Sequence, residues 1–119
     1  MYHLRTKETY ERYHNKIKRG HLENGCRLCE AEAVLVFDYW QIIDNSFPYD
    51  RIAQTHHMLI PKQHGDENAL SELEKTELLK LKYGGWLENY DFIFESLPQG
   101  KSIPAHHHLH LIKVKEFTT

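Results

Sequence analysis

Three histidines alternate along one apolar stretch near the end of the chain, and this alternation constrains the fold more than any other feature. The stretch covers residues 104–112 and predicts a β-strand. Successive side chains of a strand point to opposite faces, so His106, His108 and His110 share one face. Three imidazoles on one rigid surface suit metal ligation, or nucleophilic and acid–base chemistry at a phosphate. The alternative is a polar strand face without a chemical role, but clustered imidazoles in an apolar strand cost desolvation free energy.

Length and charge narrow the class of protein. A chain of 119 residues is enough for one domain with one core. We expect residues 1–23 to form an N-terminal helix and lead-in, and residues 24–114 the core. The net charge of −2 argues against a nucleic-acid polymer or a membrane surface as the main partner. No apolar run approaches the roughly 20 residues of a membrane span. Residues 1–8 lack the apolar core of an export signal, which favours a cytoplasmic location.

The pattern of apolar residues predicts an α+β fold, an antiparallel sheet of about five strands with two main helices. One helix is expected at residues 6–19. A second is expected from a capping box at Ser71 and Glu74 to about Asn89. Its expected buried stripe comprises Leu79, Tyr83, Trp86, Leu87 and Tyr90. Besides the histidine strand, the expected strands cover residues 33–37, 39–43, 58–60 and 92–95.

The two cysteines, Cys26 and Cys29, form a C-x-x-C motif, in which two thiolates can reach one ion from a single turn. A tetrahedral zinc site needs two further ligands. His64 follows a predicted strand and His106 begins the histidine strand, so these two histidines are our candidates. A thioredoxin-like redox pair, or two reduced buried thiols, are the alternatives.

His108 lies at the centre of the histidine pattern and is the best-placed nucleophile for a phosphorus atom. Such a reaction needs hydrogen-bond donors for the phosphoryl oxygens. His110, Ser102 and the backbone of Gly100 and Lys101 could supply them.

These motifs resemble the histidine triad (HIT) superfamily of nucleotidyl hydrolases and transferases. The triad itself is His106-x-His108-x-His110 followed by two apolar residues. Residues 40–49 resemble the family's strand and nucleotide-contacting loop, residues 57–64 its strand ending in Pro-Lys-x-His, and residues 102–105 the lead-in to the triad. The resemblance covers about residues 24–114, with the motifs in the family's order.

The resemblance implies a specific chemistry. His108 would attack the α-phosphate of a nucleoside phosphate or dinucleoside polyphosphate, and water or phosphate would resolve the nucleotidyl-histidine intermediate. His110 would support the phosphate or leaving group, with His106 as the first triad member. Asn45 would contact the ribose and Ser102 the phosphate.

The resemblance also implies a structural metal and an assembly. The branch similar to galactose-1-phosphate uridylyltransferase binds structural zinc at positions that correspond to Cys26, Cys29, His64 and His106, the four residues already chosen from spacing. Members of the family are usually homodimers.

Departures from the family pattern leave two other functions open. His107 replaces an apolar residue, Glu95 stands where many members have Asn near the phosphate, and residues 50–54 lengthen a loop. A carboxylate near the phosphate would favour a non-catalytic, zinc-containing nucleotide-binding module of the same fold. In the third alternative, all three triad histidines ligate the metal of a zinc hydrolase.

Overall fold

The sheet predicted from the sequence is present and has five antiparallel strands. A computed structural model describes residues 4–18, 26–97 and 106–116. Within them the strands lie in the order β1-β2-β3-β5-β4. Their bounds are β1 Ala33–Val36, β2 Trp40–Asp44, β3 Ala53–Pro61, β4 Phe92–Phe94 and β5 Leu109–Val114. The fold is therefore α+β, as the sequence predicts.

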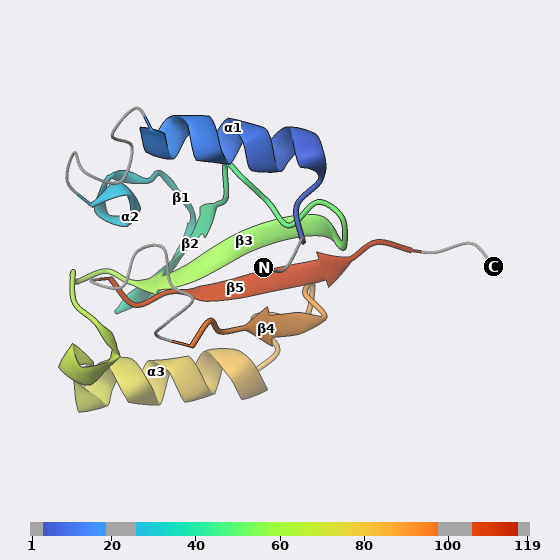
Figure 1. The fold of residues 1–119 in the computed structure, drawn as a ribbon. Helices are drawn as coiled ribbons and strands as arrows, with labels where there is room; N and C mark the ends of the chain where they lie inside the picture. The colour runs from blue at the N-terminus through green and yellow to red at the C-terminus, as the bar shows by residue number, and fades with distance from the viewer. Residues whose placement is uncertain (1–3, 19–25, 98–105, 117–119) are drawn as a thin grey trace.

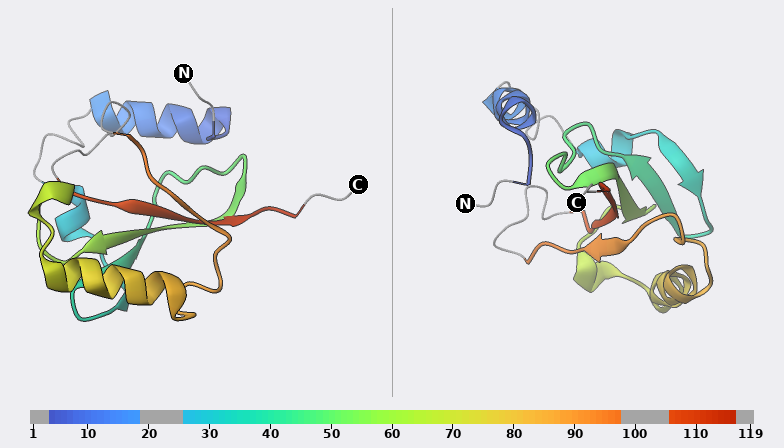
Figure 2. Two further views of the ribbon diagram at one scale, coloured as in Figure 1. Left: turned by 90° about the horizontal axis from the view of Figure 1, so that it is seen from below. Right: turned by 90° about the vertical axis from the view of Figure 1, so that its right-hand side faces the viewer.

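Helices lie on both sides of this sheet (Figure 1). The two main helices have 12 residues each, α1 at Lys7–Lys18 and α3 at Glu72–Tyr83. They lie on opposite sides of the sheet, as the right-hand view of Figure 2 shows. The described residues also form two short helices, α2 at Arg27–Glu30 and the 3-10 helix η1 at Glu67–Ala69. Of the helices described here, none is long and apolar enough to cross a membrane.

Strand β3 is longer than predicted, and this strand sets the geometry of the site. The expected strand covered residues 58–60 only, and residues 53–54 were assigned to the lengthened loop. The backbone N–H groups of Ile52 and Ala53 donate to the carbonyl oxygen of Tyr49, at 3.0 and 2.9 Å. This tight turn starts the strand at Ala53, and the strand then pairs with β2 on one side and β5 on the other.

Strand β5 is shorter at its start than predicted. It begins at Leu109, so His106, His107 and His108 precede it, and residues 104–105 lie outside the described part of the chain. The N–H of His107 donates to the carbonyl oxygen of Gly65 at 2.7 Å instead of joining the sheet ladder. Two triad histidines, His106 and His108, therefore lie in the loop before β5, and only His110 lies in the strand.

Helix α3 begins as predicted but ends early. Ser71 and Glu74 form the expected capping box. The helix ends at Tyr83 and not near Asn89, because Gly84 caps it and Gly85 adopts a positive φ of 83°. A Cβ atom at Gly84 would lie only 2.5 Å from the carbonyl oxygen of Lys80, so this close turn requires glycine.

The buried stripe predicted for this helix is wrong in part. Leu79, Tyr83 and Trp86 are exposed, whereas Leu81 is buried, and Leu78, Leu87 and Tyr90 pack against the core. Leu79 and Tyr83 lie within the helix but away from its buried side, which Leu78 and Leu81 form, whereas Leu87 and Tyr90 reach the core from beyond Gly84. One helical period fitted across the turn at Gly84 therefore put the stripe of the helix itself on the wrong side.

The main core lies between the sheet and α3. Its buried members are Trp40, Ile42, Leu59, Leu81, Leu109 and Leu111. The indole Nε1–H of Trp40 donates to the carbonyl oxygen of Glu74 at 2.8 Å, and Glu77 accepts from the N–H groups of Tyr39 and Trp40. These bonds fix α3 to β2. The opposite face carries two smaller clusters, built around Leu28, Ile43 and Ile60 and around Tyr49, Ala53 and Ile112.

We predict that Trp40→Phe lowers the free energy of unfolding by about 1–3 kcal/mol, because it leaves a small void and removes the bond to Glu74. The matched control is Trp86→Phe, whose side chain is 62% exposed, with an expected change within about 0.5 kcal/mol. Urea unfolding followed by circular dichroism checks both variants. Equal losses in the two would contradict the assignment of Trp40 as the anchor of α3.

Candidate active site and metal centre

The four residues predicted to bind a metal ion come together at one end of the sheet. Cys26 precedes α2 and Cys29 lies within it, His64 follows β3, and His106 precedes β5. One donor atom from each lies within 4.8 Å of all the others. His106 Nδ1 is 3.3 Å from the Sγ atoms of both Cys26 and Cys29, and His64 Nδ1 is 3.3 Å from Cys29 Sγ. Two thiols and two imidazoles at these distances form a group that could bind a metal ion.

His106 is already held in the tautomer that a metal ion requires. Its Nε2–H donates to the carbonyl oxygen of Pro61 at 3.0 Å, so Nδ1 carries the lone pair and faces the two sulfurs. The side chain is fully buried, and burial lowers the pKa of His106, which favours the neutral ring. Metal-bound histidines commonly donate their second nitrogen to a carbonyl in this way.

The raised thiol pKa of Cys29 does not favour the alternative of a thioredoxin-like redox pair. Desolvation, followed by the neighbouring Cys26 and Glu30, raises the pKa of Cys29 to about 11, although the side chain is partly exposed. A redox-active C-x-x-C pair needs a lowered thiol pKa so that a thiolate is present at neutral pH. A metal ion, by contrast, displaces the proton on binding. The C-x-x-C segment opens the four-residue helix α2 with Cys26 at its N-cap, which spacing alone did not predict.

One ring nitrogen of His108 is hydrogen-bonded to the backbone of His106. Its Nδ1 lies 2.9 Å from the carbonyl oxygen of His106 and donates to it, since a carbonyl can only accept. The neutral ring therefore keeps its lone pair on Nε2. Nitrogen in this state is the form that attacks phosphorus. The ring packs edge-on against His110, with centroids 5.3 Å apart.

A fourth histidine, His56, belongs to this cluster and was missed in the sequence. His56 Nδ1 accepts from the N–H of Tyr49 at 2.9 Å, so its Nε2 carries the hydrogen and donates to His110 Nδ1 at 2.8 Å. His110 Nε2 is then left as a hydrogen-bond donor. A chain of three hydrogen-bonded groups thus fixes which nitrogen of His110 can reach an anion.

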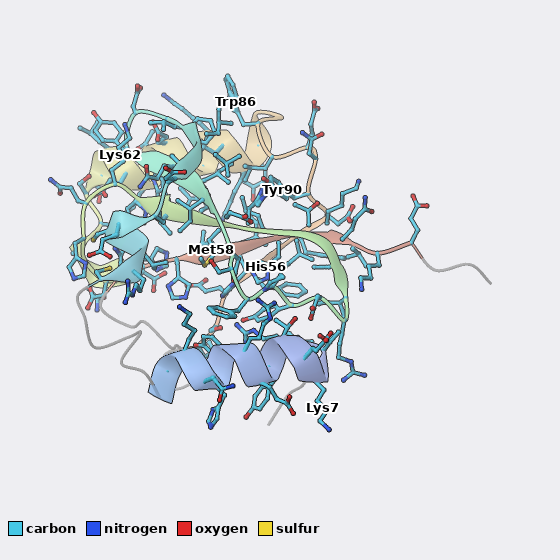
Figure 3. The ribbon with its side chains drawn as sticks, turned by 90° about the horizontal axis from the view of Figure 1, so that it is seen from above. Lys7, His56, Met58, Lys62, Trp86 and Tyr90 are labelled. Atoms are coloured by element: carbon cyan, nitrogen blue, oxygen red, sulfur yellow. The ribbon has the colours of Figure 1, made fainter. Side chains whose placement is uncertain are left out.

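The alternation of β3 could have revealed His56. Met58 pairs with His110, so His56, two residues earlier, lies on the same face, whereas His57 pairs with Leu111 on the other. Figure 3 shows His56 and Met58 on the side of the sheet that faces α1, and Tyr90 on the opposite side. His57 Nδ1 lies 2.6 Å from the hydroxyl of Tyr90 there. The resemblance matched the family's strand to residues 57–64, so it included His57 and left out His56.

Burial keeps the imidazole pair neutral. It lowers the pKa of His56 to about 3, with smaller contributions from the charges of His110 and Arg5. It likewise lowers the pKa of His110 to about 3, assisted by His108 and Arg5. At neutral pH both rings therefore act through one N–H and one lone pair, without a full charge.

Asn45 lies beside the histidine cluster, on the loop that the resemblance assigned to the nucleotide. Its Oδ1 accepts from the N–H of Phe47 at 2.8 Å, and its Nδ2 lies 3.2 Å from His56 Nε2. Both of these nitrogen atoms carry hydrogen in the arrangement above, so the second contact is packing and not a hydrogen bond. Asn45 therefore lies against His56, the residue that is bonded to His110.

The residues that lead into α1, together with its first turn, hold this loop in place. Asp50 accepts from the hydroxyls of Thr6 and Thr9 and from the N–H of Thr6. These bonds outweigh the effect of burial and lower the pKa of Asp50. Arg5 donates from Nε to the carbonyl oxygen of Phe47 at 2.7 Å and stacks over Tyr13 and Tyr49. The N-terminal segment thus fixes the residues that flank Asn45.

Three predicted site residues lie outside the described part of the chain: Gly100, Lys101 and Ser102. Glu95 is described, and it does not lie with the triad. Phe94 pairs with His110, so Glu95, the next residue, is directed to the α3 side, where its carboxylate lies near Glu67 and His107. The expected repulsion between Glu95 and a phosphate at His108 therefore has no geometric basis.

The three triad histidines do not converge on one point. His106 faces the cysteines, His108 Nδ1 bonds to a carbonyl, and His110 Nδ1 bonds to His56. Among the residues the structure describes, the possible ligand groups include neither His108 nor His110. The arrangement does not support the alternative of a catalytic metal held by all three.

We predict that the histidine pair makes stability depend on pH. The unfolded chain takes up protons near the ordinary histidine pKa of 6.5, whereas the folded His56 and His110 do so only near 3. Stability from this source is complete above 6.5 and is lost as the pH falls toward 3, at about 1.4 kcal/mol per pH unit for each residue. His56→Gln should therefore flatten the decline between pH 6 and 4 by about that amount.

Denaturant unfolding at several pH values measures this decline. The matched control is His14→Gln, at an exposed position of α1, which should keep the wild-type slope. Identical slopes for wild type and His56→Gln would show that His56 takes up its proton at the same pH in the folded protein as in the unfolded chain.

Comparison with known proteins places the fold. No family model matches the sequence, and no curated protein does. Several solved structures are similar, and three of them follow. A HIT family hydrolase from Legionella pneumophila Philadelphia 1 aligns with a TM-score of 0.53 and 23% identity over 79% of this chain and 96% of its own. A Hit Like Protein gives 0.51 and 18% over 85% and 96%, and a histidine triad protein from Clostridium difficile gives 0.54 and 16% over 79% and 94%. At these identities the similarity establishes the fold, and the chain has the fold of the histidine triad proteins.

Proposed function

We propose that this protein is a nucleotidyl hydrolase or transferase of the histidine triad type. Its substrate would be a nucleoside phosphate or a dinucleoside polyphosphate, attacked at the α-phosphate. The observation that carries this proposal is the bond from His108 Nδ1–H to the carbonyl oxygen of His106, which leaves Nε2 as a nucleophile. The similarity to a HIT family hydrolase supports the same class of reaction.

The reaction would proceed in two displacements. The lone pair of His108 Nε2 forms a bond to the α-phosphorus while the bond from phosphorus to the leaving group breaks, and the leaving group departs with that electron pair. The Nε2–H of His110 would donate to a phosphoryl oxygen or to the leaving group. Water or phosphate then attacks the same phosphorus from the vacated side while the bond from phosphorus to Nε2 breaks, which restores the lone pair of His108. An attacking water would give up one proton, to the departed leaving group or to solvent.

The remaining roles rest on the resemblance and on position. Asn45 would bind the ribose, because it lies beside His56 on the loop fixed by α1. Ser102, Lys101 and the backbone of Gly100 would bind the phosphate. Residues 1–119 would form one domain, and a homodimer and a cytoplasmic location stay predictions.

We also propose that the four-residue group binds structural zinc. Cys26, Cys29, His64 and His106 have the donor types and proximity of a closed tetrahedral site. When bound, zinc would supply folding free energy by joining α2, the end of β3 and the start of the triad. The ligand His106 also provides the carbonyl that orients His108, so the ion would stiffen the support of the nucleophile.

We predict that His108→Ala abolishes covalent labelling and reduces turnover by at least about 10³-fold, because the attacking nitrogen is gone. The protein is mixed with an adenosine phosphoramidate, a dinucleoside polyphosphate and a nucleotide sugar, quenched without acid, and examined by intact-mass spectrometry. Wild type should gain the mass of one nucleotidyl group.

The control for this experiment is His14→Ala, which should be labelled like wild type. Turnover retained in His108→Ala would refute the mechanism. Tight nucleotide binding by wild type without any adduct or turnover would instead identify a binding module.

We predict that the double variant Cys26→Ser, Cys29→Ser loses its zinc and several kcal/mol of stability, because only two ligands remain. Metal analysis after dialysis should give one zinc per wild-type chain, and a chelator should lower the melting temperature of wild type alone. His14→Asn is the control histidine variant and should retain zinc. Full zinc content in the double variant would refute the site.

A further inference from the structure

We propose a second divalent-cation site formed by Glu67, Glu95 and His107 on the α3 side of the sheet. One carboxylate oxygen from each glutamate and one ring nitrogen of His107 all lie within 4.8 Å of one another. Two ligands on opposite sides of an ion bound at 2.0–2.2 Å would be about 4 Å apart, so small side-chain movements suffice. None of these residues belongs to the Cys26 group or to the triad machinery described above.

Three separate parts of the fold bring this group together. Glu67 begins η1, Glu95 directly follows β4, and His107 lies two residues before β5. The N–H of His107 donates to the carbonyl oxygen of Gly65 at 2.7 Å, which fixes the triad lead-in against the segment that carries Glu67. The pairing of Phe94 with His110 turns the following Glu95 to the side of Leu109. The convergence is therefore built by the backbone and does not depend on flexible surface side chains alone.

The group combines one buried donor, the imidazole of His107, with two exposed donors, the carboxylates of Glu67 and Glu95. His107 is 2% exposed, and its ring packs edge-on against Trp40 with centroids 6.1 Å apart. The two glutamates are exposed and reach the imidazole from the surface. Two carboxylates this close repel each other, and a bound cation would reverse that repulsion. Solvent could complete the coordination from the open side.

The donor set indicates which cations would bind. Two carboxylates and an imidazole suit first-row divalent cations with oxygen and nitrogen preference, such as Mn²⁺, and lack the thiolates that select zinc at the first site. Adjacent residues would then serve two ions, since His106 faces Cys26 and Cys29 while His107 faces Glu67 and Glu95. A cation here would fix the backbone immediately before His108.

The test uses Mn²⁺ as the probe, added to the full chain with zinc already loaded. Free Mn²⁺ is followed by electron paramagnetic resonance, and the melting temperature is recorded in parallel. Wild type should bind one equivalent and melt at a higher temperature with Mn²⁺. The double variant Glu67→Gln, Glu95→Gln should bind at least about tenfold more weakly and show no rise, because both anionic ligands become neutral amides.

The matched control is Glu30→Gln, Glu72→Gln, which removes two exposed carboxylates from elsewhere on the surface. It should bind Mn²⁺ like wild type. Absence of Mn²⁺ binding by wild type, or equal binding by the Glu67 and Glu95 variant, would overturn the proposal.

A further measurement uses only the wild-type protein, so it does not require any variant to fold. Bound Mn²⁺ broadens the nuclear magnetic resonance signals of nearby protons. The ring signals of His107 should broaden at substoichiometric Mn²⁺, while those of the exposed His14 stay sharp. Broadening at other histidines without His107 would place the ion elsewhere and refute the site. None of these measurements involves nucleotide turnover, so the result is independent of the proposed enzymatic function.

Discussion

The hydrogen bond from His106 Nε2 to the carbonyl oxygen of Pro61 is the interaction on which the rest of the site depends. It leaves His106 Nδ1 as the lone-pair nitrogen that faces the two cysteines, and it positions the His106 carbonyl that binds His108. The four-residue group that could bind a metal ion and the candidate nucleophile therefore share a single support. Pro61 ends β3, so the support is itself fixed by the central strand of the sheet.

Much of this site follows from local spacing. The C-x-x-C motif and the alternating histidines identified Cys26, Cys29 and His106, and His64 followed from its position at a strand end. These residues come together as predicted. The capping box at Ser71 and the α+β sheet were equally accessible, because each depends on residues close in sequence or on a regular period.

The failures have a different physical origin. Strand alternation puts His56 on the same face as Met58, but its bond to His110 depends on the pairing of β3 with β5, a contact over 54 residues that local spacing does not give. The stripe of α3 was misplaced because one period was fitted to residues on both sides of the turn at Gly84 and Gly85, so Leu79 and Tyr83 were chosen within the helix in place of Leu78 and Leu81. The resemblance placed Glu95 near the phosphate. The face on which Glu95 lies depends on the register of β4, which the sequence does not state.

The register of β3 also limits how this sequence can change over time. Two histidines stand side by side in it, and His56 reaches His110 while His57 reaches Tyr90 on the other face. Insertion or deletion of one residue between Thr55 and Pro61 would exchange these two positions and swap the side chains that the strand presents to the two faces of the sheet. A change of two residues would preserve the faces. In a lineage that retains this arrangement, substitutions in β3 can accumulate, but length changes in that segment are expected only in even steps.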